Sequence, residues 1–164
     1  LLVKASKLSK PNQKNFKKDK NDLGFVGEPI KINKDFLKWC IDSDFIPVIA
    51  PIGYGNKFET FNINADTMAG HVASSVNSER LVLLTDVKGV FDKKGNLLTQ
   101  ISIKDAKKLI KNGTISKGMI PKVETCINAV QNGVNAAVIL DGTFPHAILL
   151  EIFTEHGVGT LITK

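Results

Sequence analysis

Several features that define particular protein classes are scarce or missing in this sequence of 164 residues. It has two cysteines, Cys40 and Cys126, which are too few for a disulfide framework and favour a reducing compartment. No run approaches the roughly 18 consecutive apolar residues of a membrane-spanning helix. Lys4 follows directly after Leu1, Leu2 and Val3, so nothing at the start is typical of a signal peptide. We therefore expect a soluble, cytoplasmic protein that contacts no membrane.

Sequence motifs for several kinds of chemistry are also missing. There is no G-x-x-x-x-G-K-[ST] phosphate loop and no G-x-G-x-x-G motif. No G-x-S-x-G nucleophile elbow is present. The three histidines (His71, His146 and His156) have no metal-ligand spacing with the cysteines, so no metal bound by the protein is expected. These absences argue against an ordinary P-loop kinase, a serine hydrolase and a zinc enzyme.

Positive charge is concentrated at one end of the chain. Residues 1–34 hold nine lysines and three acidic residues, whereas the remainder holds 13 basic and 13 acidic residues. The basic segment is interpreted as a solvated hairpin or arm at about residues 1–22. Binding to nucleic acid is not expected, because Lys4–Lys20 contains a single aromatic residue, Phe16, for base stacking.

The pattern of the chain predicts one α/β domain with a mainly parallel open sheet between helices. Buried strands are expected at residues 81–84, 136–140 and 160–163. Phe45–Ala50 is a short apolar run that contains Pro47, and a turn-rich segment follows at 51–56. A helix is predicted from residue 34, with Asn33 as its N-cap and with Phe36, Leu37, Cys40 and Ile41 on one face. Four more helices are predicted over 65–77, between Ser102 and Gly113, from Pro121 to Gly133, and over 147–153.

Ligands of open α/β sheets bind beyond the carboxyl ends of the strands, and three polar segments fit such positions. The first is Asn62–Asp66, where Asn64 is expected only to cap a helix and Asp66 lies near the first helical turn. The second, Thr85–Phe91, directly follows a buried strand. The third is Ser116–Lys122, where Lys122 opens a helix although the helix dipole favours an acidic residue there. This misfit suggests that Lys122 grips an anionic phosphate.

Taken in order, these segments resemble the acetylglutamate kinases of the amino-acid-kinase family. The resemblance extends from Leu23–Glu28 through Ile46–Pro51, Asn62–Asp66 and Leu83–Val87 to Gly118–Lys122. It implies an amino-acid-kinase-like fold that is incomplete at its N-terminal side. The glycine-rich loops and the arginine with which that family's N-terminal part grips phosphate and substrate do not occur here. The chain therefore resembles the C-terminal, nucleotide-binding part of the enzyme, and we expect it to be inactive alone.

The resemblance implies transfer of the γ-phosphoryl group of ATP to the side-chain carboxylate of N-acetyl-L-glutamate in arginine biosynthesis. Lys122 would neutralise charge on the transferring group, Asp66 would hold the catalytic lysines in place, and Asn62 would bind the acetylglutamate. Mg²⁺ would enter with ATP as co-substrate. The nucleotide site would be lined by Asp86, Val87, Lys88, Gly89, Val90, Phe91, Thr114, Ile115 and Ser116.

The C-terminal segment resembles that of the arginine-inhibited, ring-forming hexamers of this family. The resemblance implies a homo-oligomer, a PII nitrogen-signalling protein as a further partner, and an arginine effector site formed by His146, Glu151 and Gly157. The alternative interpretation is an ordinary amphipathic helix, with Ile148, Leu149 and Ile152 buried and Glu151 in solvent. Two other functions stay open, namely a glutamate 5-kinase or aspartate kinase and a non-catalytic module that binds ATP or arginine.

Overall fold

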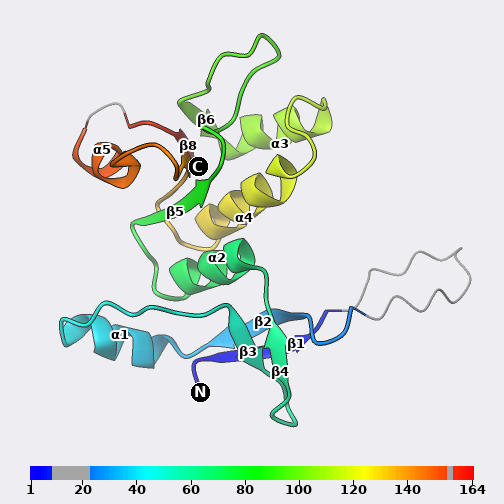
Figure 1. The fold of residues 1–164 in the computed structure, drawn as a ribbon, viewed down its shortest axis with the longest axis vertical. Helices are drawn as coiled ribbons and strands as arrows, with labels where there is room; N and C mark the ends of the chain where they lie inside the picture. The colour runs from blue at the N-terminus through cyan, green and yellow to red at the C-terminus, as the bar shows by residue number, and fades with distance from the viewer. Residues whose placement is uncertain (9–22, 155–156) are drawn as a thin grey trace, which may run out of the picture. The chain divides into compact units, whose positions relative to one another are not determined.

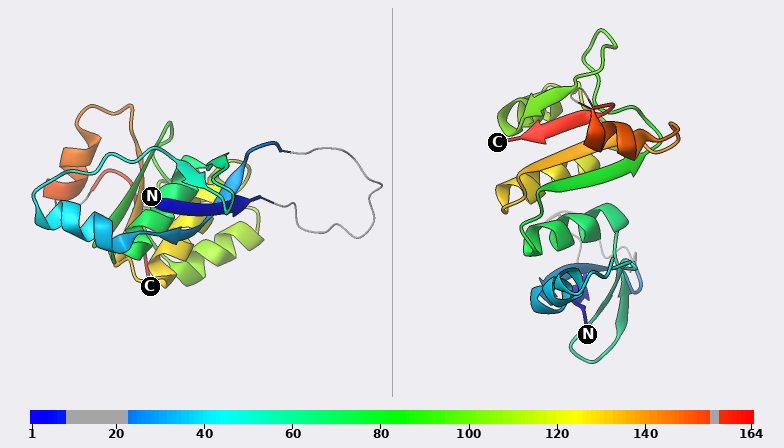
Figure 2. Two further views of the ribbon diagram at one scale, coloured as in Figure 1. Left: turned by 90° about the horizontal axis from the view of Figure 1, so that it is seen from below. Right: turned by 90° about the vertical axis from the view of Figure 1, so that its left-hand side faces the viewer.

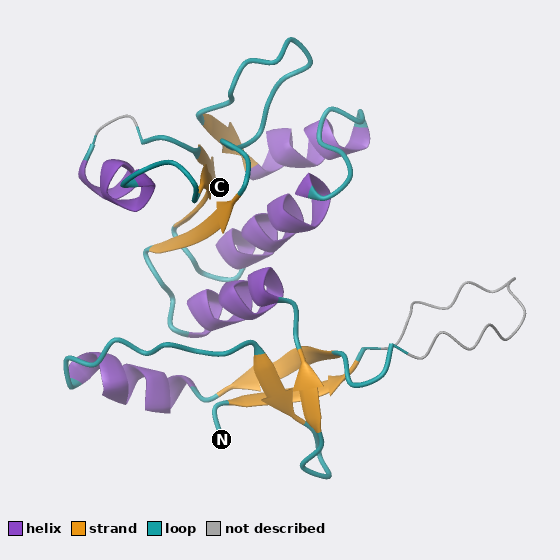
Figure 3. Cartoon of the chain, viewed as in Figure 1, coloured by secondary structure: helices purple, strands orange, loops and turns teal. Residues whose placement is uncertain are grey.

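The computed structural model describes residues 1–8, 23–154 and 157–164. These residues form two compact units, Leu1–Val72 and Ala73–Lys164, whose elements are labelled in Figure 1. Each unit combines a four-stranded sheet with helices (Figure 3), so the predicted α/β class is confirmed.

The sheet of the first unit has the strand order β2-β1-β3-β4. Its strands β1 and β2 pair antiparallel, as do β3 and β4, and only β1 and β3 are parallel. The prediction of a mainly parallel sheet does not hold for this unit, because two of its three strand pairs are antiparallel. Its elements are β1 (Val3–Lys7), β2 (Gly27–Ile32), α1 (Lys34–Asp42), β3 (Ile52–Tyr54), β4 (Thr60–Asn62) and α2 (Ala65–Ser75), which runs on into the second unit.

The predicted basic hairpin or arm overlaps the first strand of this sheet. Residues 3–7 form β1, and the Leu8 N–H donates to the carbonyl of Val26 at 2.8 Å, which extends the pairing of β1 with the chain before β2. Residues 9–22, which carry most of the predicted arm, lie outside the described residues.

The sheet of the second unit has the order β5-β7-β8-β6. Here β5 and β7 are parallel, β6 and β8 are parallel, and only β7 and β8 are antiparallel, so this sheet is mainly parallel as predicted. Figures 1 and 2 show α3 and α4 on one face of the sheet and α5 on the other. The elements are β5 (Arg80–Thr85), β6 (Gln100–Ser102), α3 (Ile103–Lys111), α4 (Met119–Gln131), β7 (Ala136–Asp141), α5 (Ala147–Phe153) and β8 (Thr160–Thr163).

Strand β7 lies at the centre of the second unit's core. The side chains of residues 137–140 are all 0% exposed. Val138 and Leu140 form a cluster with Ala147 of α5, and α4 packs against β7 with Val123, Ile127 and Val130 buried. Because side chains alternate between the two faces of a strand, β7 needs helices on both sides.

Several predicted buried positions are wrong in detail. In α1, Leu37 and Cys40 are buried, but Phe36 and Ile41 on the same predicted face are 48% and 52% exposed. Leu84 at the end of β5 is 48% exposed, so this strand is not covered on both faces along its whole length. Both elements form as predicted, but how much of each is covered depends on tertiary neighbours.

The first unit carries an exposed apolar surface. The rings of Phe36 and Trp39 stack with centroids 6.0 Å apart, and Phe45 lies 6.1 Å from Trp39. Further along the chain, Ile46 is 91% exposed and Val48 is 97% exposed. Large exposed apolar patches are in general typical of sites that contact other protein.

Candidate active site

The carboxyl ends of β5 and β7 form one edge of the second unit's sheet. The two strands are parallel and in register up to the pair Thr85 and Asp141. The Gly142 N–H donates to the Thr85 carbonyl at 2.8 Å and closes this edge. The Thr85 hydroxyl donates to the Asp86 carboxylate at 3.1 Å. Carboxylates and hydroxyls from two neighbouring strands are thus gathered where α/β sheets bind their ligands.

Asp141 is a charged group of this edge that the sequence analysis did not single out. Its carboxylate accepts hydrogen bonds from the Thr143 hydroxyl at 2.6 Å and from the Thr143 N–H at 2.8 Å. The bond from the Thr143 hydroxyl is the largest cause that lowers the pKa of Asp141. The bond from the Thr143 N–H and the positive charge of Lys88 lower this pKa further. The structure therefore brings Lys88, one of the predicted nucleotide-binding residues, near the carboxylate of Asp141.

Replacing Thr143 by valine should raise the pKa of Asp141, because it removes the hydrogen bond that lowers this pKa most. The folded pKa lies below the unfolded value of about 3.9, so the stabilisation is present above that pH and is lost as the pH falls through the folded value. A carbon-detected NMR titration of the carboxyl group measures the change. Asp92, whose pKa is lowered mainly by the Asn96 side chain, is the internal control, and an unchanged Asp141 pKa would contradict the assignment.

The segment Asp86–Phe91 presents only some of its side chains to solvent. Asp86, Val87 and Lys88 are exposed, whereas Val90 is 2% exposed. The Val90 N–H donates to the buried hydroxyl of Thr160 at 2.8 Å. Gly89 has a φ of +144°, and a Cβ at this position would lie 2.5 Å from that hydroxyl oxygen. Gly89 and Val90 thus anchor the loop, and the exposed side chains of the preceding three residues can contact a ligand.

Lys122 lies in the N-terminal part of α4, four residues after the N-cap Gly118. Helix α4 packs on β7 and leads directly into it, so the two run antiparallel. A helix of 13 residues and a strand of six are each roughly 20 Å long. The N-terminal end of α4 therefore lies at the same end of the sheet as the carboxyl end of β7, and Asp86 and Asp141 lie at that end too.

The opening of α4 offers few free backbone donors to an anion. The Met119 N–H donates to the Ser116 carbonyl and the Ile120 N–H donates to the Lys117 carbonyl, each at 3.2 Å. Pro121 has no N–H to donate. The first turn contains no acidic residue, and Gly118 supplies no side-chain cap. An anionic group at this position would therefore be held by side chains, with Lys122 the nearest cation on the helix itself.

The predicted nucleotide residues 114–116 connect α3 to α4. The Thr114 hydroxyl and N–H donate to the Asn112 side chain at 2.7 and 3.1 Å. Ile115 is 2% exposed and belongs to the core, whereas Ser116 is exposed. In this segment Ser116 and the half-buried Thr114 are the residues available to a ligand.

Asn62 and Asp66 belong to the first unit, where a strand leads into a helix. Asn62 is the last residue of β4 and is exposed, while Asp66 lies in the first turn of α2 and is half-buried. The Asn64 side chain accepts from the Thr67 N–H at 3.1 Å, so the prediction that Asn64 caps the helix is confirmed. Asp66 occupies a position where the helix dipole favours an anion.

The C-terminal candidate residues are separated by the structure. Glu151 and Gly157 line one cavity of about 330 Å³ in the second unit. His146 precedes α5 as its N-cap, is exposed, and is not among the residues that line this cavity. The ordinary amphipathic alternative for this helix is wrong, because Glu151 is 7% exposed whereas Ile148, Leu149 and Ile152 are 43–54% exposed.

Sequence reasoning missed Arg80, Asp141 and Thr160. Asp141 could have been found by the rule that identified Asp86, since it also directly follows a buried strand. Arg80 and Thr160 act through partners about 70 positions away in the sequence, and no local pattern indicates such contacts.

The described residues offer neither a metal-binding group nor a membrane-spanning helix. The described residues contain no group of three or more His, Cys, Asp or Glu side chains arranged to hold a metal ion. None of the helices in the described ranges has the length and apolar character to cross a membrane.

The fold and this edge are those of the α/β domains, whose ligands in general bind beyond the carboxyl ends of parallel strands. The model of the amino acid kinase family matches residues 3–141. The chain belongs to the amino acid kinase family. Giardia lamblia carbamate kinase bound to AMP-PNP has the same fold, with a TM-score of 0.68 and 23% identity over 85% of this chain and 47% of that one.

The similar curated proteins include acetylglutamate kinases. That of Rhodospirillum rubrum is 62% identical over 141 residues, which is 86% of this chain and 46% of the relative. That of Bartonella tribocorum is 57% identical over 143 residues, which is 87% of this chain and 48% of the relative. The chain thus spans about half the length of the curated relatives that it matches.

A solved structure of N-acetylglutamate synthase from Neisseria gonorrhoeae, complexed with coenzyme A and L-arginine, is also similar. It superimposes with a TM-score of 0.88 and 26% identity, over 99% of this chain and 36% of that one.

Proposed function

We propose that this chain is the nucleotide-binding part of an acetylglutamate kinase, which phosphorylates the side-chain carboxylate of N-acetyl-L-glutamate at the expense of ATP. Identities of 57% and 62% to acetylglutamate kinases support the substrate. The observation that carries the mechanism is Lys122, a cation at the opening of a helix that has no acidic residue in its first turn. This opening is level with the carboxyl ends of β5 and β7.

In the proposed reaction the substrate's carboxylate is the nucleophile. One of its oxygens forms a bond to the γ-phosphorus, the bond from that phosphorus to the β,γ-bridging oxygen breaks, and ADP leaves with the electron pair. Negative charge accumulates on the transferring group and on the leaving oxygen, so positioned cations lower the barrier. Lys122 is assigned this role, and Mg²⁺ enters with ATP as part of the co-substrate.

ATP would bind along the carboxyl edge of the second unit. The exposed Asp86, Val87 and Lys88 are the residues expected to contact the nucleotide directly, together with Thr114 and Ser116. Gly89, Val90 and Ile115 would act through the backbone, because their positions are buried. Phe91, which is 37% exposed, completes the predicted lining.

The acceptor would be recognised from the first unit. Asn62 is assigned to bind N-acetyl-L-glutamate, since its amide can both donate and accept hydrogen bonds. Asp66 is assigned to orient the ammonium groups of catalytic lysines by charge-assisted hydrogen bonds. Both residues lie within five positions of each other at the junction of β4 and α2.

A substrate comparison tests the proposal against other amino acid kinases. The complete enzyme, meaning the polypeptide encoded by the whole reading frame that contains this chain, should release ADP only with N-acetyl-L-glutamate among N-acetyl-L-glutamate, L-glutamate and L-aspartate. Preference for glutamate or aspartate would replace the proposed substrate. ATP binding without turnover of any of the three would favour a non-catalytic module.

The proposed enzyme is a cytoplasmic homo-oligomer, and a hexamer if it responds to arginine. The exposed aromatic and aliphatic surface of the first unit supports association with further protein. A PII nitrogen-signalling protein stays a prediction from the resemblance, which no feature of the described residues addresses.

We further propose that L-arginine inhibits the enzyme at the cavity that Glu151 and Gly157 line. A structure similar at 26% identity is complexed with L-arginine, and the cavity contains a buried carboxylate that can pair with a guanidinium. His146 does not line this cavity, so its side chain is not assigned to the proposed arginine site.

Replacing Glu151 by alanine in the complete enzyme should relieve arginine inhibition and leave kcat nearly unchanged. The half-inhibitory arginine concentration should rise at least ~10-fold, the size of one charge-assisted hydrogen bond. Glu151→Gln removes the charge with little change of volume and should act in the same direction. The control is Glu124→Gln on the exposed face of α4. Equal sensitivity of wild type and both Glu151 variants would show that the cavity is not the effector site.

A further inference from the structure

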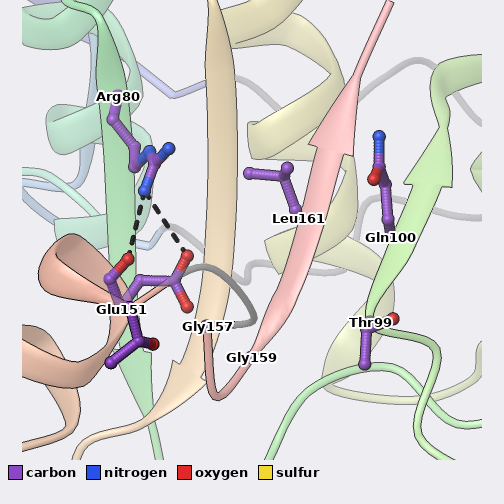
Figure 4. A pocket seen from close by; sticks show the side chains of 8 residues that line it. Arg80, Thr99, Gln100, Glu151, Gly157, Gly159 and Leu161 are labelled. Carbon is purple, nitrogen blue, oxygen red and sulfur yellow. Dashed lines mark hydrogen bonds and ion pairs between the residues drawn. The ribbon is translucent and has the colours of Figure 1, made fainter.

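The single arginine of the chain contacts a buried carboxylate. Arg80 is the only arginine among the 22 basic residues, and its guanidinium lies 3.6 Å from the Glu151 carboxylate. The Glu151 side chain is 7% exposed, whereas that of Arg80 is 40% exposed. Both residues line the cavity of about 330 Å³ that Figure 4 shows from close by. A carboxylate buried to this extent requires a cation beside it.

Arg80 is a weakly held partner for this carboxylate. The same nitrogen, Nη1, lies 3.6 Å from Oε1 and donates to the Glu151 backbone carbonyl at 3.4 Å. Both distances exceed the 2.7–3.2 Å range of good N–H···O hydrogen bonds. A well-placed arginine instead directs two nitrogens at the two carboxylate oxygens in a parallel fork. The pairing seen in Figure 4 therefore leaves most of the hydrogen-bonding capacity of the guanidinium unused.

The backbone opposite Arg80 holds the carboxylate more firmly. The Val158 N–H donates to Oε2 of Glu151 at 3.0 Å. Gly157 approaches so closely that a Cβ there would overlap this oxygen. The carboxylate is thus fixed from one side by the main chain, and its other side faces the cavity and the partly exposed guanidinium of Arg80.

We propose that Arg80 is an internal competitor that occupies the guanidinium position of this cavity, and that a ligand bearing a guanidinium binds by displacing it from Glu151. The inference rests on the effector site proposed above and specifies how that site recognises its ligand. Exchange keeps the buried carboxylate paired throughout, so the cost of leaving a buried charge alone is avoided. Arg80 can move into solvent because its side chain is already partly exposed.

The same exchange gives the cavity its selectivity. A ligand guanidinium can replace Arg80 with the two-nitrogen geometry that Arg80 lacks, while a lysine ammonium cannot. Citrulline has the shape of arginine without its charge and would leave Glu151 unpaired. Thr99 and Gln100 also line the cavity, so the amino and carboxylate groups of an amino acid would meet a hydroxyl and an amide. L-arginine should therefore displace Arg80, and L-lysine and L-citrulline should not.

NMR of the chain itself tests the exchange directly, because a chain with one arginine gives one arginine Nε–Hε signal. On titration with unlabelled L-arginine to millimolar concentration, this signal should move in a saturable way to the position of a solvated arginine. The Val158 amide signal should shift over the same range, since its hydrogen bond reports on Glu151. L-lysine and L-citrulline at equal concentration should change neither signal.

Variants of the complete enzyme separate failure of this inference from failure of the effector site. Arg80→Gln should lower the half-inhibitory arginine concentration by about two- to fivefold, the effect of removing a competing, partly exposed ion pair. Arg80→Lys keeps a cation in place and should stay near wild type. Should Glu151→Ala abolish inhibition while Arg80→Gln weakens arginine binding or leaves it unchanged, the effector site stands and the competitor role is wrong. If arginine does not inhibit the enzyme and the Arg80 signal does not move, both the effector site and the competitor role are wrong.

Discussion

Replacing Lys122 by alanine in the complete enzyme is expected to lower kcat at least ~100-fold, the lower range for losing one preorganised group that stabilises transition-state charge. The helix dipole and the absent first-turn acid give no stability reason for a cation at this position. The first backbone donors of α4 are engaged or missing, so they offer little compensation when the ammonium group is removed. Steady-state kinetics with saturating ATP and N-acetyl-L-glutamate measure the effect.

The matched control is Lys107→Ala, which removes an exposed lysine from α3. It should leave kcat within about twofold, since exposed charges away from a site contribute little. Thermal unfolding of both variants checks that the fold persists. A folded Lys122→Ala enzyme with near-normal kcat would contradict the assigned role.

The 164-residue chain alone is expected to bind Mg-ATP weakly and to release no ADP in response to N-acetyl-L-glutamate. It spans about half the length of the acetylglutamate kinases that it matches. Ile46 and Val48 are more than nine-tenths exposed, and we propose that other protein covers them in the active enzyme. Titration calorimetry with ATP and a coupled ADP assay measure binding and turnover.

A chimera distinguishes a missing part from a defective one. In it, this chain replaces the matching part of the Rhodospirillum rubrum acetylglutamate kinase, to which it is 62% identical. The chimera should release ADP with N-acetyl-L-glutamate, whereas the same chimera carrying Val48→Asp should lose activity or fail to assemble. Acetylglutamate-dependent turnover by the isolated chain would show that the half of the relatives that this chain does not match is dispensable.

Local signals predicted the ends of the helices well. The Asp105 N–H donates to the Ser102 hydroxyl at 3.1 Å, and that hydroxyl donates to the Asp105 carboxylate at 2.7 Å, so Ser102 caps the helix that is predicted to begin after it. Helix α5 at 147–153 and strand β8 at 160–163 have the predicted bounds. These features depend on residues only a few positions apart, so they can be predicted from the sequence alone.

The strands of the first unit could not be predicted in this way. Strand β3 has three residues and lies within the segment 51–56, whose proline and two glycines predict turns. Its pairing with β1 joins residues about 50 positions apart, at Lys4 and Tyr54. Short strands of this kind are stabilised by partners distant in the sequence, which local propensity does not report.

The candidate site divides along the same line. The positions of Asp86, directly after a buried strand, and of Lys122, at the start of a helix, could be predicted because both rules are local. Their functional roles stay predictions. The burial of Glu151 could not be predicted, because a carboxylate on a helix of mostly apolar residues is expected in solvent. Its burial depends on Arg80, 71 positions away, and on the Val158 N–H beyond the end of α5.

The most direct test of the account is to trap the product of the complete enzyme with hydroxylamine, which converts an acyl phosphate to a stable hydroxamate. With ATP and N-acetyl-L-glutamate, the account predicts one hydroxamate of N-acetyl-L-glutamate for each ADP released, and loss of both signals in Lys122→Ala. ADP release without hydroxamate, or hydroxamate formed only from glutamate or aspartate, would contradict it.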